Sequence, residues 1–148
     1  MALFSKSAIF APCMGRAIGI DYGAKRTGIA VTDPLKISVN PLVTIHTEEL
    51  KDYLVQYARR EPVDLFVLGD PFHKDGSPTA LNKTIHEFGD WLKKMFEQAE
   101  VHYVDERHTS RKAVDILVKK GTPKTKRNKE AIDQVSAILI LQNYLNHI

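Results

Sequence analysis

Carboxylates stand at the ends of several apolar segments of this 148-residue chain. In chain order they are Asp21 after "RAIGI", Asp70 after "VLG", Asp105 and Glu106 after "VHYV", and Asp133 in the helical pattern "EAIDQVSAILILQNYL". Functional groups of open α/β sheets gather beyond the carboxyl ends of the strands, so the first four are expected at one rim, which the helical aspartate could also face. Crowded carboxylates repel one another unless a cation neutralises them. Singly, each is more simply a turn former, cap or ion-pair partner, but together they favour a hard divalent ion.

The elements that must position these carboxylates follow from the hydrophobic periodicity. Strands are predicted over residues 16–21, 27–33, 36–45, 64–69 and 101–106. Helices are predicted over residues 47–60, 78–98, 109–118 and 129–146. Pro41 indicates a bulge or an edge position in the third strand, and the continuously apolar "DLFVLG" indicates a strand that is covered on both faces. This order is typical of an α/β mixed sheet with helices packed on its faces.

Length and composition indicate one globular domain. Apolar residues make up 43% of the chain and charged residues 26%, and no apolar run approaches the roughly 20 residues that a membrane span needs. A lone Cys13 cannot form an internal disulfide, which agrees with a cytoplasmic protein. We expect residues 1–14 to be a disordered N-terminal extension and residues 15–148 to form the single domain.

Positive charge is concentrated near the C-terminal helix. The segment "KKGTPKTKRNK", residues 119–129, carries six basic residues and no acidic one, in a chain whose formal net charge is +3. Its glycine, proline and threonines predict an exposed loop. The segment is equally well interpreted as a solvated linker or as an arm that binds a polyanion through Lys124, Lys126, Arg127 and Lys129.

Four motifs in this order and spacing resemble the YqgF/RuvX family of the ribonuclease H-like superfamily, whose members are described as Holliday junction resolvases or pre-16S rRNA nucleases. They are "GIDYGAKRTGIAVTD", "VLGDPFHKDGS", "VDERHTSRKA" and "IDQVSAILILQNYL". The resemblance covers nearly everything from Gly15 onward. It implies a five-stranded mixed sheet, with a three-strand antiparallel meander plus two parallel strands, flanked by helices.

The resemblance also implies roles for individual residues. Asp21, Glu106 and Asp133 correspond to the catalytic, metal-binding carboxylates of the family, with Asp105 or Arg107 supporting the second of them or contacting phosphate. Arg26, in the glycine-containing turn, would touch the nucleic-acid backbone. The expected cofactor is Mg²⁺ or Mn²⁺, with two ions when substrate is bound.

The chain departs from the family pattern at Asp70, where leucine is usual. If the first and fourth strands are neighbours, Asp70 begins about 4.8 Å from Asp21, so it could add to or replace a metal ligand. The alternative is a carboxylate that turns outward to start the "DPFHKDG" turn.

The function predicted on these grounds is a divalent-metal-dependent nuclease. Its substrate is expected to be structured RNA, as in 5′-end processing of pre-16S rRNA, or branched DNA such as a Holliday junction. A monomer or a homodimer fits, with no membrane partner. Two alternatives remain open: a non-catalytic nucleic-acid-binding module, and a nucleotide-binding protein of the actin or Hsp70 ATPase type, for which one domain is too short.

Overall fold

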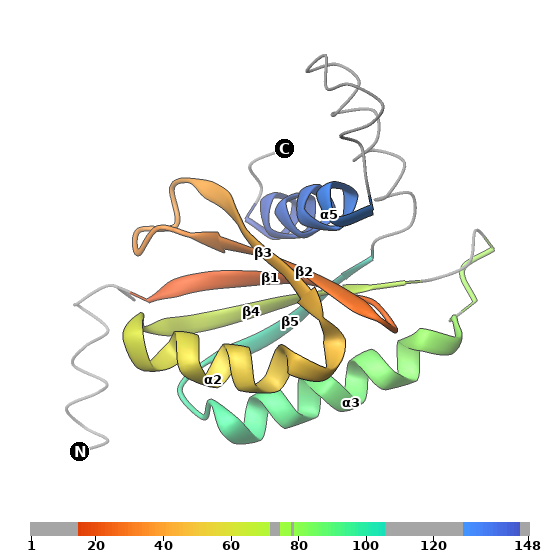
Figure 1. The fold of residues 1–148 in the computed structure, drawn as a ribbon, viewed down its shortest axis with the longest axis horizontal. Coiled ribbons are helices and arrows are strands. Elements are labelled where there is room, and N and C mark those ends of the chain that lie inside the picture. The colour runs from red at the N-terminus through yellow and green to blue at the C-terminus, as the bar shows by residue number, and fades with distance from the viewer. Residues whose placement is uncertain (1–14, 72–74, 78, 106–128, 146–148) are drawn as a thin grey trace, which may run out of the picture.

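The structure is a computed structural model that describes residues 15–71, 75–77, 79–105 and 129–145 (Figure 1). Five strands form one sheet in the order β3-β2-β1-β4-β5. They are β1 (Arg16–Tyr22), β2 (Arg26–Thr32), β3 (Val39–His46), β4 (Val63–Asp70) and β5 (Glu100–Asp105). β1, β2 and β3 pair antiparallel, whereas β4 pairs parallel to both β1 and β5. The predicted mixed sheet, a meander plus two parallel strands, is confirmed.

The helical elements are η1 (Thr47–Glu49), α2 (Leu50–Arg60), α3 (Ala80–Met95) and α5 (Lys129–Tyr144). α3 is shorter than the predicted segment 78–98, because Phe96 leaves helical geometry at φ −120° and ψ 74°. The expected N-terminal extension (1–14) and the predicted helix 109–118 lie outside the described residues. No helix within the described ranges is long and apolar enough to cross a bilayer.

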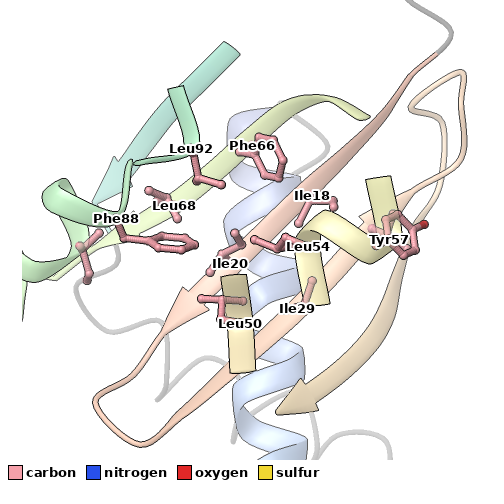
Figure 2. Close-up of a cluster of buried hydrophobic side chains, with 12 residues drawn as sticks. Ile18, Ile20, Ile29, Leu50, Leu54, Tyr57, Phe66, Leu68, Phe88 and Leu92 are labelled. Carbon is pink, nitrogen blue, oxygen red and sulfur yellow. The ribbon is translucent and has the colours of Figure 1, made fainter. Parts of the chain in front are cut away.

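Successive strand residues point to opposite faces of the sheet, and each face has its own helical cover (Figure 1). α2 and α3 cover one face, where large side chains form the main core. Figure 2 shows the strand residues Ile18, Ile20, Ile29, Phe66 and Leu68 together with the helix residues Leu50, Leu54, Tyr57, Phe88 and Leu92. Fully burying one such side chain stabilises the fold by about 1.5–3 kcal/mol. β4 is apolar on both faces, as its sequence predicts.

Among the described elements α5 covers the other face, and the residues of β1 and β2 beneath it are small. Ala17 and Ala30 pack with Ala137, Ile140 and Leu141. Gly19 and Gly28 lie directly under the helix: a Cβ on Gly19 would be 2.5 Å from Leu141 Cγ, and one on Gly28 would be 2.3 Å from the carbonyl oxygen of Asp133. These glycines therefore allow α5 to approach the strands at backbone distance.

β3 is an edge strand with an irregular register. Ile29 pairs with Val43 and the next residue, Ala30, pairs with Pro41, so Leu42 is an extra residue on β3. Proline cannot donate a ladder hydrogen bond, which explains why it is tolerated at this place. Both features predicted from Pro41, the edge position and the bulge, are confirmed.

Candidate active site

Two of the predicted carboxylates meet at the carboxyl end of β1. Asp21 shares the α5 face of β1 with Gly19 and pairs across the ladder with Gly28. The backbone of Asp133 rests on that same Gly28, where a Cβ would lie 2.5 Å from the Asp133 carbonyl carbon and 2.9 Å from its Cβ. One glycine thus sits beside the strand aspartate and beneath the helix aspartate.

Both carboxylates line a cavity of about 880 Å³. The remaining lining comes from the end of β1, the β1–β2 turn, the ends of β2 and β3, η1 and the first turn of α3; it comprises Tyr22, Gly23, Ala24, Lys25, Arg26, His46, Glu48 and Leu81. The cavity is therefore acidic where Asp21, Asp133 and Glu48 lie, basic along the turn and apolar beside Tyr22 and Leu81.

Arg26 lies between the basic and acidic sides. Its Nε is 3.9 Å from Asp133 Oδ2, and the two side chains are 32% and 17% exposed. At that distance the pair is an ion pair rather than a hydrogen bond, so little free energy holds it together. The guanidinium is consequently only weakly held by the carboxylate.

Thr47, the first residue of η1 after β3, fixes the β1–β2 turn by hydrogen bonds to its backbone. The Thr47 amide donates to the Lys25 carbonyl at 2.9 Å, and its hydroxyl donates to the Gly23 carbonyl at 2.6 Å. The buried Thr27 hydroxyl is 2.9 Å from that of Thr47. Gly23 has no room for a side chain, because a Cβ would lie 2.3 Å from the carbonyl oxygen of Arg26. These contacts fix the backbone that carries Lys25 and Arg26.

Asp70 lies at the end of the neighbouring strand but on the opposite face. It alternates with Phe66 and Leu68, which belong to the core under α2 and α3. Its Oδ1 accepts a hydrogen bond from Asn82 Nδ2, and its Oδ2 accepts one from His86 Nε2 at 2.9 Å. The expectation of an outward-turned carboxylate is wrong, because Asp70 is 8% exposed. The placement also argues against Asp70 as a metal ligand beside Asp21.

The neighbours of Asp70 form a second polar group, beneath α3. The His86 ring stacks on Tyr103 of β5 with ring centroids 4.2 Å apart. Burial, and then the charges of Asp90 and Asp70, raise the pKa of the Tyr103 phenol. Asp105 is in register with Asp70 and follows Tyr103 at the strand period, so it belongs to this face as well.

Several predicted site residues lie outside the described part of the chain: Glu106, Arg107, Lys124, Lys126 and Arg127. Lys129 begins α5, but its side chain is likewise outside what the structure describes. Within the described residues no group of three or more His, Cys, Asp or Glu could hold a metal ion. Of the three main predicted ligands the structure describes Asp21 and Asp133; the two possible additions, Asp70 and Asp105, are also described but lie on the opposite face of the sheet.

Sequence reasoning missed Lys25, His46 and Thr47. Lys25 stands next to Arg26 in the turn, which was a usable signal. His46 and Thr47 gave none, because their approach to the turn depends on the register in which Arg26 pairs with His46.

The sheet order and its two-sided helical cover are those of the ribonuclease H-like fold. Two solved structures of Thermus thermophilus RuvC agree, each aligned over 88% of this chain and 96% of that chain. One, of RuvC alone, gives a TM-score of 0.55 at 10% identity. The other, of RuvC in complex with a Holliday junction substrate, gives 0.53 at 13% identity. At these identities the likeness establishes the fold alone.

The chain belongs to the RuvX family, described as Holliday junction resolvases, whose model matches residues 15–147. A Porphyromonas gingivalis relative is 46% identical over 135 residues, covering 90% of this chain and 98% of its own. One from Bacteroides thetaiotaomicron is 42% identical over 133 residues, covering 89% and 96%. Both are named "Putative pre-16S rRNA nuclease". The class of activity is therefore that of a nuclease, a hydrolase of nucleic-acid phosphodiester bonds.

Proposed function

We propose that this chain hydrolyses a phosphodiester bond in pre-16S rRNA, at its 5′ end, with a divalent metal held by Asp21, Asp133 and Glu106. The observation that carries the proposal is that Asp21 and Asp133, which are far apart in the sequence, line one cavity. Glu106 follows directly after β5 and enters the proposal through the family motif.

The two described carboxylates fit a hard metal ion. Carboxylate oxygens are the ligands that Mg²⁺ and Mn²⁺ prefer in proteins, and the close contact of α5 with Gly28 holds the Asp133 backbone beside Asp21. Asp70 and Asp105 are not included in the ligand set, because they belong to the opposite face. When bound, two such ions activate the attacking water and stabilise the leaving oxygen.

The basic residues of the chain would bind the substrate backbone. Arg26, in a weak ion pair with Asp133, exchanges that partner for a phosphate oxygen beside the carboxylates. Arg107 and the basic segment 119–129, with Lys124, Lys126, Arg127 and Lys129, would extend the contact along the strand. Affinity should therefore fall steeply as salt is raised.

RNA is proposed over branched DNA because the two relatives at 42–46% identity are named for pre-16S rRNA. Trimming one end needs one site, so a monomer suffices, whereas resolving a four-way junction needs two symmetrically placed sites in a homodimer. The proposal includes a cytoplasmic location. It also takes residues 15–148 as the nuclease domain, and the family match over residues 15–147 supports this range.

A cleavage panel tests this function. The substrates are an RNA carrying the 16S precursor 5′ flank and a four-way DNA junction, each with Mg²⁺, Mn²⁺ or EDTA. The wild-type protein should cut the RNA only with metal, and Asp21→Asn should lower the rate at least about a hundredfold with an unchanged melting temperature. Asp52→Asn, on the exposed side of α2, is the matched control. Junction cleavage without RNA cleavage would assign DNA as the substrate, and full activity of Asp21→Asn would overturn the mechanism.

A further inference from the structure

The cavity beside the carboxylates is lined by more residues than the two proposed metal ligands. Of the lining residues, Asp21 and Asp133 are those proposed to hold metal; most of the others come from the end of β1, the β1–β2 turn and the first turn of α3. A volume of about 880 Å³ is that of a pocket for one ligand of small-molecule size, since such pockets span about 300–1,000 Å³. The rest of the cavity therefore has room for part of the substrate.

One part of this wall is apolar. Tyr22 and Leu81 line the cavity and also pack against the core under α2 and α3. Tyr22 is held there by Phe88, with ring centroids 5.3 Å apart. Ala24 adds an exposed methyl group at the tip of the turn. A surface of this kind, anchored in the core, suits the flat apolar face of a nucleobase.

Another part of the wall is basic. Lys25 and His46 are exposed and lie on either side of Arg26, one preceding it in the turn and one paired with it across the ladder. The Thr47 amide fixes the backbone of the turn at the Lys25 carbonyl. A lysine ammonium and an imidazole beside an apolar wall match the two ends of a nucleotide, a phosphate and a base.

We propose that this wall, with the apolar side chains of Tyr22, Ala24 and Leu81 and the polar ones of Lys25 and His46, binds a single unpaired nucleotide next to the scissile phosphate. In a duplex both faces of a base are covered by its stacked neighbours, so only an unstacked nucleotide can place its base against an apolar wall. The chain therefore selects a single-stranded segment at the cut. This inference rests on the proposed nuclease function and names the form of substrate that the site takes.

Binding measured without cleavage tests the subsite. In the Asp21→Asn background with Mg²⁺, fluorescence anisotropy compares a hairpin RNA with a three-nucleotide 5′ extension and the same hairpin with a blunt end; matching DNA hairpins form a second arm. The extended RNA should bind about tenfold tighter. Adding Lys25→Ala with His46→Ala, two exposed positions of this wall, should reduce the preference to about twofold or less.

Lys94→Ala is the matched control for charge, because this exposed lysine lies in the last turn of α3, about 20 Å along the helix from Leu81. It should leave the preference unchanged. Equal binding of blunt and extended hairpins, or a preference that survives Lys25→Ala with His46→Ala in protein with a normal melting curve, would overturn the subsite. A preference for extended RNA in a protein whose wild type does not cut RNA would retain the subsite and remove the proposed reaction. A preference confined to DNA would assign the subsite to single-stranded DNA.

Discussion

Asp21 and Asp70 end adjacent parallel strands, yet they belong to different parts of the molecule. Asp21 points to the α5 face and lines the cavity, whereas Asp70 points to the α3 face and binds Asn82 and His86. The difference follows from alternation along the strands, because Gly69 and not Asp70 follows the parity of Asp21. Adjacent positions at a sheet rim are thus insufficient to make two carboxylates share a site.

The same alternation separates the chemistry from the main core. On the α2 and α3 face, large side chains such as Ile20 and Phe66 fill the space between sheet and helices (Figure 2). On the α5 face, glycine and alanine let the helix backbone reach the strands. The first face stabilises the fold, and the second places a helix residue, Asp133, beside a strand residue, Asp21.

Substitutions at Gly28 and Ile29, neighbours on β2 that point to opposite faces, should show the largest difference between the two faces of the sheet. Gly28→Ala should push α5 away, because its Cβ would meet the Asp133 backbone at 2.3 Å, and a backbone atom has no alternative rotamer. We expect cleavage to fall about a hundredfold, since displacing one catalytic group by about 1 Å costs that much. Stability should fall by about 1–3 kcal/mol from overpacking.

The control for Gly28→Ala is Ile29→Val, one residue along and on the opposite face. It should lower the free energy of unfolding by about 0.5–1.5 kcal/mol and leave the cleavage rate of the folded protein near that of the wild type. Urea unfolding and single-turnover cleavage measure the two quantities. If both variants lose stability and activity in the same proportion, the two faces are not functionally distinct.

The second test separates the two aspartates. Asp70→Ala should lower the free energy of unfolding by about 1–3 kcal/mol, because Asn82 and His86 lose their shared acceptor. Cleavage by the folded protein should remain. Asp52→Ala, at an exposed position of α2, should stay within about 0.5 kcal/mol. A stable Asp70→Ala protein that no longer cuts would return Asp70 to the metal site.

Sequence reasoning could predict the elements because their periodicity is a local property. The apolar stripe of α2, with Leu50, Leu54 and Tyr57 buried, and the edge position of Pro41 were readable from spacing and backbone chemistry alone. The approach of Asp133 to Asp21 was predicted in outline. The contact through Gly28 was not, because it depends on how closely α5 approaches the sheet.

The face that Asp70 occupies could not be read in the same way. β4 is covered on both faces, so its residues show no polar and apolar alternation that would give the parity of the last one. The useful signal was on α3, where Asn82 and His86 are four residues apart and therefore on one side of the helix. A pair of polar residues beside the apolar stripe indicates a buried polar partner.

The β1–β2 turn, which lines the cavity, and the β2–β3 turn, which lies away from it, allow the same comparison with smaller expected effects. Thr47→Val removes the hydroxyl that fixes the Gly23 carbonyl but keeps the shape of the side chain. Losing this hydrogen bond should raise KM about fivefold, equivalent to about 1 kcal/mol, because Lys25 and Arg26 are less well placed for phosphate. Thr47→Ser keeps the hydroxyl and should restore KM. Steady-state cleavage kinetics decide, and equal KM values for the two variants would show that the turn needs no such support.

The β2–β3 turn lies at the other end of β2, away from the cavity, and its charged residues make hydrogen bonds and ion pairs within the fold. Asp33 accepts hydrogen bonds from the amides of Leu35, Ile37 and Ser38, and Lys36 forms an ion pair with Asp64 at 2.9 Å. The hydrogen bond from the Ser38 amide lowers the pKa of Asp33 the most, and those from the Ile37 and Leu35 amides lower it further, so the pKa lies below its ordinary value.

A group whose pKa is lower in the folded state stabilises the fold above its unfolded pKa, and this contribution is lost as the pH falls through the folded pKa. The unfolding free energy of the wild type should therefore decrease on acidification by slightly more than that of Asp33→Asn. The effect is small because the carboxylate is exposed, and cleavage at neutral pH should be unchanged. An NMR titration of the Asp33 carboxyl measures the shift directly. An ordinary pKa of Asp33 would mean that the hydrogen bonds from the backbone amides do not hold this turn. Loss of cleavage in Asp33→Asn would extend the functional surface to the far end of the sheet.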